Sequence, residues 1–464
     1  MTGARPRHVA VIDIGKTNAK LVAVDLATLE QTVARQMPNT VRTDGLYPHF
    51  DADALWGFIE EGLVALAKES PVDAVSVTTH GAAGAVLDGQ GPLALPLLDY
   101  EHDGPENLAN DYDALRPPFS ETGSPRLAGG LNLGAQFFWQ QKTFPELWAR
   151  ARTLLTYPQF WGHRLTGARA SDWCSLGAHT DLWKPGERRF SPLVEKLGWT
   201  AMMAPVRAPG EVLGPLRIDL ARRLGLKPGA PVFCGIHDSN ASLYPHLLVR
   251  DAPFSVVSTG TWVIVLSLGD GTPKTLDPAR DTLMNVNASG DPVASARFMG
   301  GREYQLLTEG LSGAATQADA DSVLKDGVML MPSVHENSGP FPGLAHEWLP
   351  EKPTAPGKVL AAASFYLAAM TATSLRLTGA AGPVVVEGPF ARNALYVRML
   401  RATVGRPVLA SPGGTGASLG AALLADPAAA KGPSSGGDQE IADPGPLWAD
   451  WFRRWSARAE ARRS

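Results

Sequence analysis

Apolar positions repeat with two different spacings along the N-terminal part of the chain. Strand-like runs of β-branched and apolar residues occupy 8–15 (HVAVIDIG), 20–26 (KLVAVDL) and 73–81 (DAVSVTTHG). Between the second and third runs, residues 51–69 (DADALWGFIEEGLVALAKE) place apolar side chains at helical spacing. Strands that alternate with helices in this way predict an α/β sheet.

The same alternation begins again near the middle of the chain. Strand-like runs at 253–269, 382–388 and 406–411 accompany a long helical run at 356–378, and a helix of small residues is expected at 416–425. Two similar-sized α/β halves are therefore expected, joined near residues 245–255. We assign residues 1–248 to an N-terminal domain and residues 249–428 to a C-terminal domain.

The composition changes after residue 428. Residues 431–446 (KGPSSGGDQEIADPGP) are rich in Gly, Pro and Ser, as is typical of a flexible linker, so the fold proper is expected to end there. Residues 429–464 are assigned to this linker and an amphipathic C-terminal helix, whose apolar face carries Leu447, Trp448, Trp451, Phe452 and Trp455. That helix is expected to dock on its own domain, and a dimer contact is the alternative.

Composition and charge restrict the classes of function. Hydrophobic residues make up 44% of the 464 residues and charged residues 19%, so large cores are expected and general disorder is not. The net charge is −4, so nucleic acid is not an expected partner. The uncharged run 359–375 is shorter than the ~20 residues that cross a bilayer, and we interpret it as a buried core helix.

The N-terminal segment MTGARPRHVAVIDIG passes from a short basic stretch directly into a strand, without the apolar region of a signal peptide. A cytoplasmic location without a membrane partner is therefore expected. The two cysteines, Cys174 and Cys234, are too few for a disulfide framework and match no metal-ligand spacing. We interpret both as core residues.

Polar residues follow the first predicted strand in a pattern that suits phosphate binding. The strand delivers Asp13 to its end, Gly15 permits a tight turn, and Lys16, Thr17 and Asn18 precede the next strand. Backbone N–H groups and these side chains can surround a phosphate, with Asp13 facing a metal ion. The same residues also fit an ordinary hairpin turn.

A second turn of this kind opens the other half. Thr259, Gly260 and Thr261 interrupt two strand-like runs, and hydroxyl residues beside a glycine again suit phosphate contact. Two such hairpins could clamp a nucleotide between the domains. Between them, the apolar run PVFCGI ends at His237 and Asp238, where Asp238 fits either a helix N-cap or a base that accepts a hydroxyl proton.

Five segments resemble, in order, the motifs of the FGGY carbohydrate kinases, members of the sugar kinase, actin and Hsp70 ATPase superfamily. They are DIGKTNAK (13–20), LTGARASDWCSLGAHTDLW (165–183), PVRAPGEVLGPL (205–216), STGTW (258–262) and VVVEGPFARNALYVRML (384–400), the last followed by GASLGAALLA (416–425). Together they cover roughly residues 8–426. The first segment carries Lys16 and Lys20 in place of a Thr and an Arg of the family pattern.

The resemblance implies two ribonuclease-H-like (actin-like ATPase) domains with an interdomain active-site cleft. It implies an ATP-dependent kinase with Mg²⁺, in which Asp238 deprotonates a sugar hydroxyl and Asp13 holds the metal ion. The N-terminal domain would bind sugar and phosphate, and the C-terminal domain would bind ATP. The implied cofactor-binding residues are Lys16, Thr17, Asn18, Lys20, Thr259, Gly260, Thr261, Gly388, Phe390 and Asn393.

The chain departs from the family pattern at three further places. The Gly-rich adenosine turn reads Gly388-Pro389-Phe390, where Phe390 packs either on adenine or on the core. Gln136 stands where the family usually has Lys, and its role is left open. The acidic position of the family's Trp-x-Asp segment aligns ambiguously with three residues, Asp99, Glu101 and Asp103.

The His-Asp pair and the TGTW hairpin look most like the branch that phosphorylates the C1 hydroxyl of 6-deoxyketohexoses, L-rhamnulose and L-fuculose. Thr79, His80 and His237 are candidate substrate contacts, with a structural hydrogen bond as the alternative for both histidines. A ketopentose or polyol kinase (xylulose, ribulose or glycerol type) and a non-catalytic actin-like nucleotide-binding protein are the alternatives. The expected partners are a small sugar and ATP, and a homodimer is left open.

Overall fold

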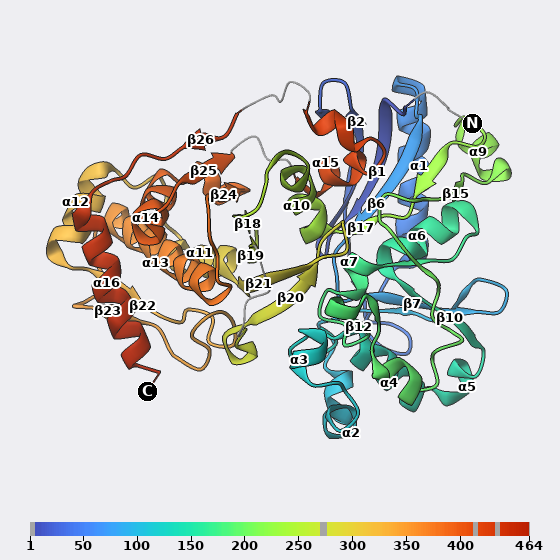
Figure 1. Cartoon of the computed structure of the whole chain (residues 1–464), viewed down its shortest axis with the longest axis horizontal. Helices are drawn as coiled ribbons and strands as arrows, with labels where there is room; N and C mark the ends of the chain where they lie inside the picture. The colour runs from blue at the N-terminus through green and yellow to red at the C-terminus, as the bar shows by residue number, and fades with distance from the viewer. Residues whose placement is uncertain (1–4, 270–275, 412–415, 432–436, 464) are drawn as a thin grey trace. The chain divides into compact units, whose positions relative to one another are not determined.

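The computed structural model describes residues 5–269, 276–411, 416–431 and 437–463 (Figure 1). The chain divides into two compact units. The first consists of Met1–Val249, Met284–Pro292 and Thr415–Ser435, and the second of Arg250–Leu283, Val293–Gly414 and Gly436–Ser464. The expected break at 248/249 therefore falls one residue from the observed one, but the expected ranges after it need correction, because two later segments pack with the first unit.

A seven-stranded sheet forms the centre of the first unit (Figure 1). Its order is β15 (Val212–Pro215), β16 (Pro231–Phe233), β6 (Ala74–Thr79), β1 (His8–Ile14), β2 (Asn18–Asp25) and β3 (Glu30–Pro38), and β17 (Ile236–His237) also pairs with β6. Strands β1, β2 and β3 are antiparallel neighbours, whereas β6 is parallel to β1 and to β17. Three parallel strands, β1, β6 and β17, therefore end at the same edge.

Alternating side chains of β1 enter two different cores. Ile12 and Ile14 pack in a core shared with α1 (Ala52–Glu69), α6 (Tyr157–Thr166) and α9 (Ile218–Leu224). Val9 and Val11 pack on the opposite face with α10 (Asp238–Val249) and α15 (Gly416–Leu423). Because the side-chain period of a strand is two, Asp13 lies on the same face as Val9 and Val11.

Smaller elements complete the first unit. Its short sheets are β4 (Val41–Arg42), β5 (His49–Phe50) and β9 (Leu97–Leu98); β10 (Ala151–Thr156), β7 (Gly84–Asp88) and β8 (Leu93–Leu95); β11 (Ser171–Asp172) and β14 (Val206–Arg207); β12 (Trp183–Lys184) and β13 (Arg189–Phe190). Its other helices are α2 (Ala109–Asp113), α3 (Phe119–Thr122), α4 (Leu133–Thr143), α5 (Pro145–Trp148), α7 (Trp173–Leu176) and α8 (Pro192–Lys196). Helix α4 is almost entirely buried in an aromatic-rich core.

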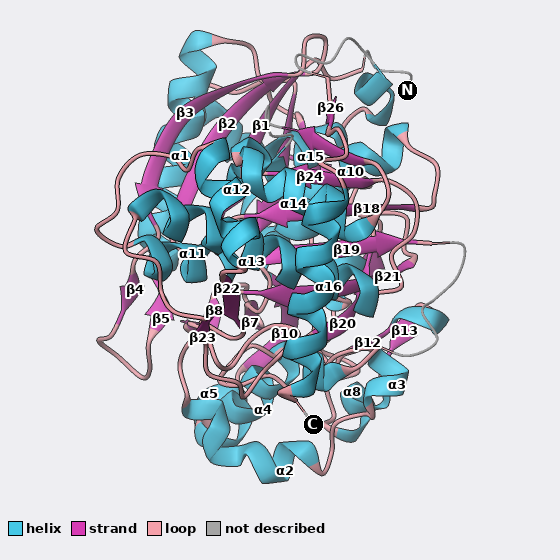
Figure 2. Cartoon of the chain, turned by 90° about the vertical axis from the view of Figure 1, so that its left-hand side faces the viewer, coloured by secondary structure: helices cyan, strands magenta, loops and turns pink. Residues whose placement is uncertain are grey.

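The sheet of the second unit repeats this topology (Figure 2). Its order is β20 (Thr282–Val286), β21 (Pro292–Phe298), β19 (Val263–Leu268), β18 (Phe254–Thr259), β24 (Val384–Glu387), β25 (Val408–Ser411) and β26 (Gln439–Glu440). As in the first unit, the opening strand pairs antiparallel with the next strand, and the strand on its other side is parallel. The turn after β18 therefore occupies the same place in its sheet as the turn after β1.

Helices cover the second sheet, and α13 (Pro356–Leu377) is the most buried of them (Figure 2). It is long and apolar enough to cross a membrane, but 94% of its apolar window is buried inside the fold, as the sequence predicted for a core helix. The remaining elements are α11 (Gly300–Thr308), α12 (Gln317–Asp326), α14 (Ala394–Val404), α16 (Pro446–Ala461), β22 (Met329–Met331) and β23 (Glu347–Leu349).

The C-terminal helix α16 is part of the second core, so the prediction that the fold ends near residue 428 is wrong. Trp448, Trp451 and Trp455 are at most 3% exposed, and the indole Nε1 atoms of Trp451 and Trp455 donate to the backbone oxygens of Val328 and Leu330. Docking on its own domain is thereby confirmed. Part of the expected linker, residues 432–436, lies outside the described residues.

Candidate active site

Three parallel strands of the first unit bring candidate residues to one edge of its sheet. In the ladder, Asp13 of β1 pairs with Thr78 of β6, and Ile236 of β17 pairs with the same Thr78. The residues that follow, His80 after β6 and His237-Asp238 at the end of β17, therefore lie at the edge where β1 ends. The carboxyl edge of parallel strands is where open α/β sheets bind ligands.

Asp13 is held from helix α15. The hydroxyl of Ser418 donates to Asp13 Oδ2 at 2.6 Å, and Lys20 lies opposite Asp13 in the β1–β2 ladder. Burial raises the pKa of Asp13, the negative charge of Asp238 acts in the same direction, and Ser418 and Lys20 oppose both. Two carboxylates close enough to repel each other suit a cation between or beside them.

The hairpin turn after Asp13 exposes two of the predicted phosphate-binding residues, Thr17 and Asn18. The N–H of Gly15 donates to the Asn18 oxygen at 2.9 Å, which closes the turn. The side chains of Thr17 and Asn18 are exposed and bond to each other at 3.1 Å. Both are accessible to a ligand.

Lys16 points to a different part of the unit. Its Nζ donates to Asp99 Oδ1, lies 3.4 Å from Glu101 Oε2, and sits 5.1 and 4.7 Å from the ring centroids of Phe50 and Tyr100. Asp99 is buried, whereas Asp103, the third residue left ambiguous by the sequence, has a side chain that is 94% exposed. The structure therefore joins Lys16 to Asp99 rather than to Thr17 and Asn18.

Asp238 is the first residue of helix α10 and is also paired with a histidine. His237 Nε2 lies 3.2 Å from Asp238 Oδ1, and the N–H of Ser239 donates to the same oxygen at 2.6 Å. His237 is buried, whereas the Asp238 side chain is 34% exposed. Asp238 thus accepts from the adjacent N–H in the first turn of α10 and still exposes its carboxylate to a ligand.

His80 presents an unused ring nitrogen in a closed aromatic environment. Its ring contacts those of Phe50, Tyr100 and Tyr157 at centroid distances of 5.1, 5.5 and 5.0 Å, and its Nδ1 lies 2.6 Å from the Gly81 oxygen. Its Nε2 is buried without a hydrogen-bond partner among the described residues. Burial lowers the pKa of His80 to about 4, so at neutral pH Nδ1 carries the proton and Nε2 is an acceptor.

Sequence reasoning missed the role of Gln136. Its Nε2 donates to the Ala82 oxygen at 2.6 Å and also to the Gly130 oxygen. Ala82 has a positive φ of 55°, a conformation that costs a non-glycine residue energy unless its surroundings hold it. Beside it, a Cβ atom at Gly81 would lie 2.8 Å from His237 Nε2. Gln136 therefore fixes the loop that carries His80 and packs on His237.

Thr79 is less available than the sequence suggested. Its hydroxyl is buried and donates to the His80 oxygen at 2.9 Å. That bond is structural, and it orients the backbone of the same loop.

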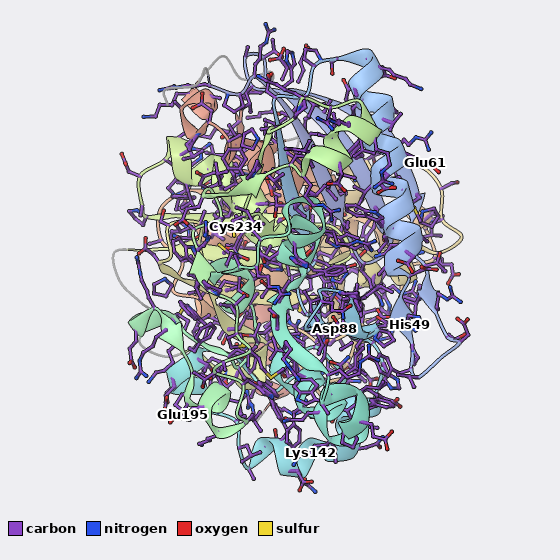
Figure 3. All side chains as sticks on the ribbon, turned by 90° about the vertical axis from the view of Figure 1, so that its right-hand side faces the viewer. His49, Glu61, Asp88, Lys142, Glu195 and Cys234 are labelled. Atoms are coloured by element: carbon purple, nitrogen blue, oxygen red, sulfur yellow. The ribbon has the colours of Figure 1, made fainter. Side chains whose placement is uncertain are left out.

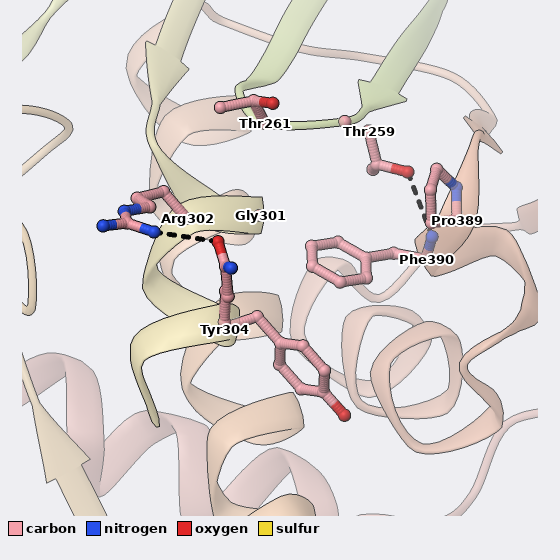
Figure 4. A pocket seen from close by; sticks show the side chains of 9 residues that line it. Thr259, Thr261, Gly301, Arg302, Tyr304, Pro389 and Phe390 are labelled. Atoms are coloured by element: carbon pink, nitrogen blue, oxygen red, sulfur yellow. Dashed lines mark hydrogen bonds between the residues drawn. The ribbon is translucent and has the colours of Figure 1, made fainter. Parts of the chain in front are cut away.

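The second unit carries a separate cavity of about 290 Å³ at the turn after β18 (Figure 4). Its walls are this turn, helix α11 and the segment after β24. The lining residues are Thr259, Gly260, Thr261, Gly301, Arg302, Tyr304, Gln305, Pro389 and Phe390. Phe390 lines the cavity, and its ring packs edge-on against that of Tyr304 with 5.5 Å between the centroids. It also belongs to the hydrophobic core of the second unit.

Close backbone approaches shape this cavity. The Thr259 hydroxyl donates to the Glu387 oxygen at 2.5 Å. It also accepts from the Phe390 N–H at 3.1 Å, a bond drawn in Figure 4. A Cβ atom would lie 2.0 Å from the Thr259 oxygen at Gly388 and 1.9 Å from the Gly260 oxygen at Gly301. Glycine is therefore required at both positions, and the sequence analysis had not singled out Gly301.

Asn393 lies outside the cavity lining. Its Oδ1 accepts from the Tyr396 N–H at 3.0 Å as the N-cap of α14, and its Nδ2 donates to Ser364 Oγ at 2.9 Å. Both ends of its amide are thus committed to structure. No group of three or more His, Cys, Asp or Glu residues that could hold a metal ion occurs within the described ranges.

Known proteins share both the sequence motifs and the fold. The chain matches the FGGY family of carbohydrate kinases, N-terminal domain, over residues 8–244, and carbohydrate kinase FGGY, C-terminal domain, over residues 251–433. A carbohydrate kinase from Novosphingobium aromaticivorans is 35% identical, with a TM-score of 0.86 over 97% of this chain and 100% of that one. The xylulose kinase of Lactobacillus acidophilus is 12% identical with a TM-score of 0.81 over 98% and 97% of the two chains, which shows the fold alone.

Curated relatives match a shorter stretch. The L-fuculokinase of Salmonella typhi is 26% identical over 266 residues, and the rhamnulokinase of Halalkalibacterium halodurans is 22% identical over 267 residues. These alignments cover 56% and 55% of both partners, so the chain spans about half the length of the curated relatives it matches. The actin-like fold class predicted from the sequence is confirmed. From its motifs, its fold and these matches, the chain belongs to the FGGY family of carbohydrate kinases.

Proposed function

We propose that the protein is an ATP-dependent kinase that transfers the γ-phosphoryl group to a hydroxyl of a small ketose. The family membership supports a carbohydrate kinase. The observation that carries the proposal is the pair His237-Asp238 at the start of α10, together with the half-buried Asp13 and the unsatisfied His80 Nε2.

Asp238 is the proposed base. Its carboxylate is accessible. Among the described residues, its contacts with Ser239 and His237 are all made through Oδ1. Oδ2 is therefore left to accept the proton of a sugar hydroxyl as the phosphoryl group is transferred. His237 holds the carboxylate in place through Oδ1.

The residues around Asp13 fit Mg²⁺. Mg²⁺ is usually bound by one or two carboxylates together with waters and substrate phosphates, so a larger protein cluster is not required. Asp13 offers a carboxylate whose pKa is raised by burial, and the Ser418 hydroxyl donates to its Oδ2. When bound, the metal ion would neutralise charge on the phosphates.

The cavity of the second unit is the proposed nucleotide site. Its apolar wall of Phe390, Pro389 and Tyr304 suits an adenine ring, and the exposed Gly260 and Thr261 suit phosphates. Thr259 supports the turn through its own hydrogen bonds rather than by direct contact. Transfer requires the ligands of both units to meet, so the cleft expected from the resemblance is part of this proposal.

We propose a 6-deoxyketohexose, L-fuculose or L-rhamnulose, as the sugar. The neutral His80 has an acceptor, Nε2, that no hydrogen bond among the described residues uses, and the rings of Phe50, Tyr100 and Tyr157 around it are apolar neighbours for a methyl group. The matched L-fuculokinase and rhamnulokinase support this choice. A cytoplasmic location is proposed with it.

Purified protein with ATP and Mg²⁺, assayed against ketopentoses, 6-deoxyketohexoses and polyols, tests the proposal. Highest kcat/KM for L-fuculose or L-rhamnulose is the expected result. Preference for xylulose, ribulose or glycerol would keep the kinase class and reject the sugar. ATP binding without turnover on any acceptor would instead support a non-catalytic nucleotide-binding protein.

A further inference from the structure

A second cavity of about 960 Å³ lies within the first unit. It is a groove walled by β5, the first turn of α1, the segment 90–97 that carries β8 and β9, the end of α6, and α9. His49, labelled in Figure 3, is one of its lining residues. The candidate active-site residues Asp13, His80 and Asp238 do not line it.

Positive charge dominates this groove. Five arginines line it against two aspartates. Four of them are already paired with carboxylates, namely Arg42, Arg164, Arg217 and Arg223. Arg169 differs, because its Nη1 donates to the neutral Thr153 hydroxyl at 3.0 Å and it forms no ion pair within the described part of the chain.

Three basic side chains share one end of the groove. The positive charges of Arg169 and Arg217 act on His163 and, together with burial as the larger cause, lower its pKa. The His163 Nδ1 lies 3.1 Å from the Ala168 oxygen, whereas a Cβ atom at Gly91, another lining residue, would lie 3.3 Å from Nε2. His163 Nε2, which does not bond to Ala168, therefore lies beside the groove wall.

We propose that this end of the groove binds the phosphate group of a small molecule, with Arg169 and Arg217 as charged contacts and His163 beside them. Guanidinium groups bind phosphate through paired N–H donors, and no carboxylate of the described residues neutralises the charge of Arg169. The volume of the groove falls within the range of small-molecule sites, roughly 300–1,000 Å³.

Phe50 connects this groove to the candidate active site. It lines the groove, and its ring lies 5.1 Å from both the Lys16 ammonium and the His80 ring centroid. Its strand β5 pairs with β9, where Phe50 lies opposite Leu97. Asp99 is the first residue after β9. A bound phosphate compound is thereby placed to change sugar affinity, an extension that rests on the proposed function.

The binding test needs neither ATP nor sugar. Inorganic phosphate and ribose 5-phosphate are titrated separately into the full chain while the His163 ring is followed by NMR, with His163→Gln used to assign its signal. Arg169→Gln should weaken binding by roughly tenfold or more, as expected for loss of a charge-assisted contact. The matched control Arg152→Gln changes an exposed arginine that bonds only to backbone oxygens of Ala149 and Ala151 among the described residues, and it should bind like wild type.

Each outcome decides the proposal. Tighter binding of ribose 5-phosphate identifies a phosphate ester as the ligand, whereas equal binding identifies phosphate itself. An unshifted His163 signal, or equal affinity in wild type and Arg169→Gln, means an adventitious ion only and overturns the site. Arg217→Gln replaces the first variant if that one does not fold. An unchanged sugar KM with saturating ribose 5-phosphate overturns the coupling, and an inactive protein that still binds the ester refutes only the kinase proposal.

Discussion

Lys16 and Asp99, 83 residues apart in sequence, form an ion pair above the rings of Phe50 and Tyr100. The Lys16 side chain is 18% exposed and that of Asp99 is 8% exposed, so water screens this pair only in part. The pair joins the first hairpin to the segment that follows β9. It therefore ties the position of a phosphate-motif residue to the wall of the proposed sugar site.

Removing both sides of this pair should cost less stability than the two single changes added together. Asp99→Asn should lower the free energy of unfolding by about 1–3 kcal/mol, because Lys16 loses its buried partner. Lys16→Met/Asp99→Asn should be less destabilised than the sum of the two single variants. Chemical unfolding of the four proteins in this double-mutant cycle measures the coupling, and additive effects would show that the pair contributes nothing.

Gln136 should matter for turnover beyond its contribution to stability. Gln136→Leu removes the donor to the Ala82 oxygen, and Gln140→Leu removes a comparable buried donor to the Tyr47 hydroxyl one helical turn away. Each should cost about 1–2 kcal/mol of stability. Only Gln136→Leu should lower kcat by a further tenfold or more, roughly 1.4 kcal/mol. Equal kcat in the two variants would make Gln136 a purely structural residue.

Asp13 should be required for Mg²⁺-dependent turnover but not for folding. Asp13→Ala removes the strand-end carboxylate, while Asp25→Ala removes a carboxylate of the same hairpin that pairs with an exposed arginine, Arg7. We expect kcat to be lost in the first variant and retained in the second, with native circular dichroism in both. Near-normal kcat for Asp13→Ala would show that Asp13 is only a turn residue.

Because of Glu303, the stability of the second unit should depend on pH. It is fully buried, accepts from the His335 N–H at 2.9 Å and the Tyr366 hydroxyl at 3.1 Å, and burial raises its pKa to about 7. Between its ordinary pKa of 4.5 and about 7 the folded state keeps a proton that the unfolded state has released. The stability that Glu303 contributes through this proton is complete below pH 4.5 and is lost as the pH rises to about 7. The loss in the free energy of unfolding is about 3 kcal/mol.

Glu303→Gln should flatten that dependence, because glutamine resembles the protonated acid. Unfolding free energies between pH 4.5 and 8 would show a smaller decline in the variant than in wild type. Glu309→Gln, at the exposed end of the same helix, should follow wild type. A decline as steep in Glu303→Gln as in wild type would assign the titration to other groups.

The sequence predicted local features better than distant pairings. Alternating apolar residues around Asp13 and the small residues near Gly260 determine both hairpins locally, so these were foreseen. Long-range contacts were not: the pairing of Lys16 with Asp99, the reach of Gln136 to Ala82, and the approach of Gly301 to Gly260 all depend on how separate elements pack. No spacing along the chain encodes them.

The unit boundaries show the same limit. Residues 416–425 were predicted as a helix, but the partner of that helix was not predictable from the sequence alone. In the structure, Leu419 and Ala421–Leu424 pack on Val9 and Val11, which places the helix in the first unit. Likewise, the Gly- and Pro-rich composition before α16 led to the wrong prediction that the fold ends near residue 428, although docking of this helix on its own domain was predicted correctly.

Asp238→Asn tests the central claim most directly. Asparagine keeps the size of the side chain and an amide oxygen that can accept from the Ser239 N–H, so stability should change by no more than about 1 kcal/mol. It removes the proton acceptor, so kcat with the preferred sugar should fall roughly 10²- to 10⁴-fold while the Kd for ATP is unchanged. Phosphorylation within about threefold of wild type, which is far less than a general base contributes, would contradict the assignment of Asp238 as the base.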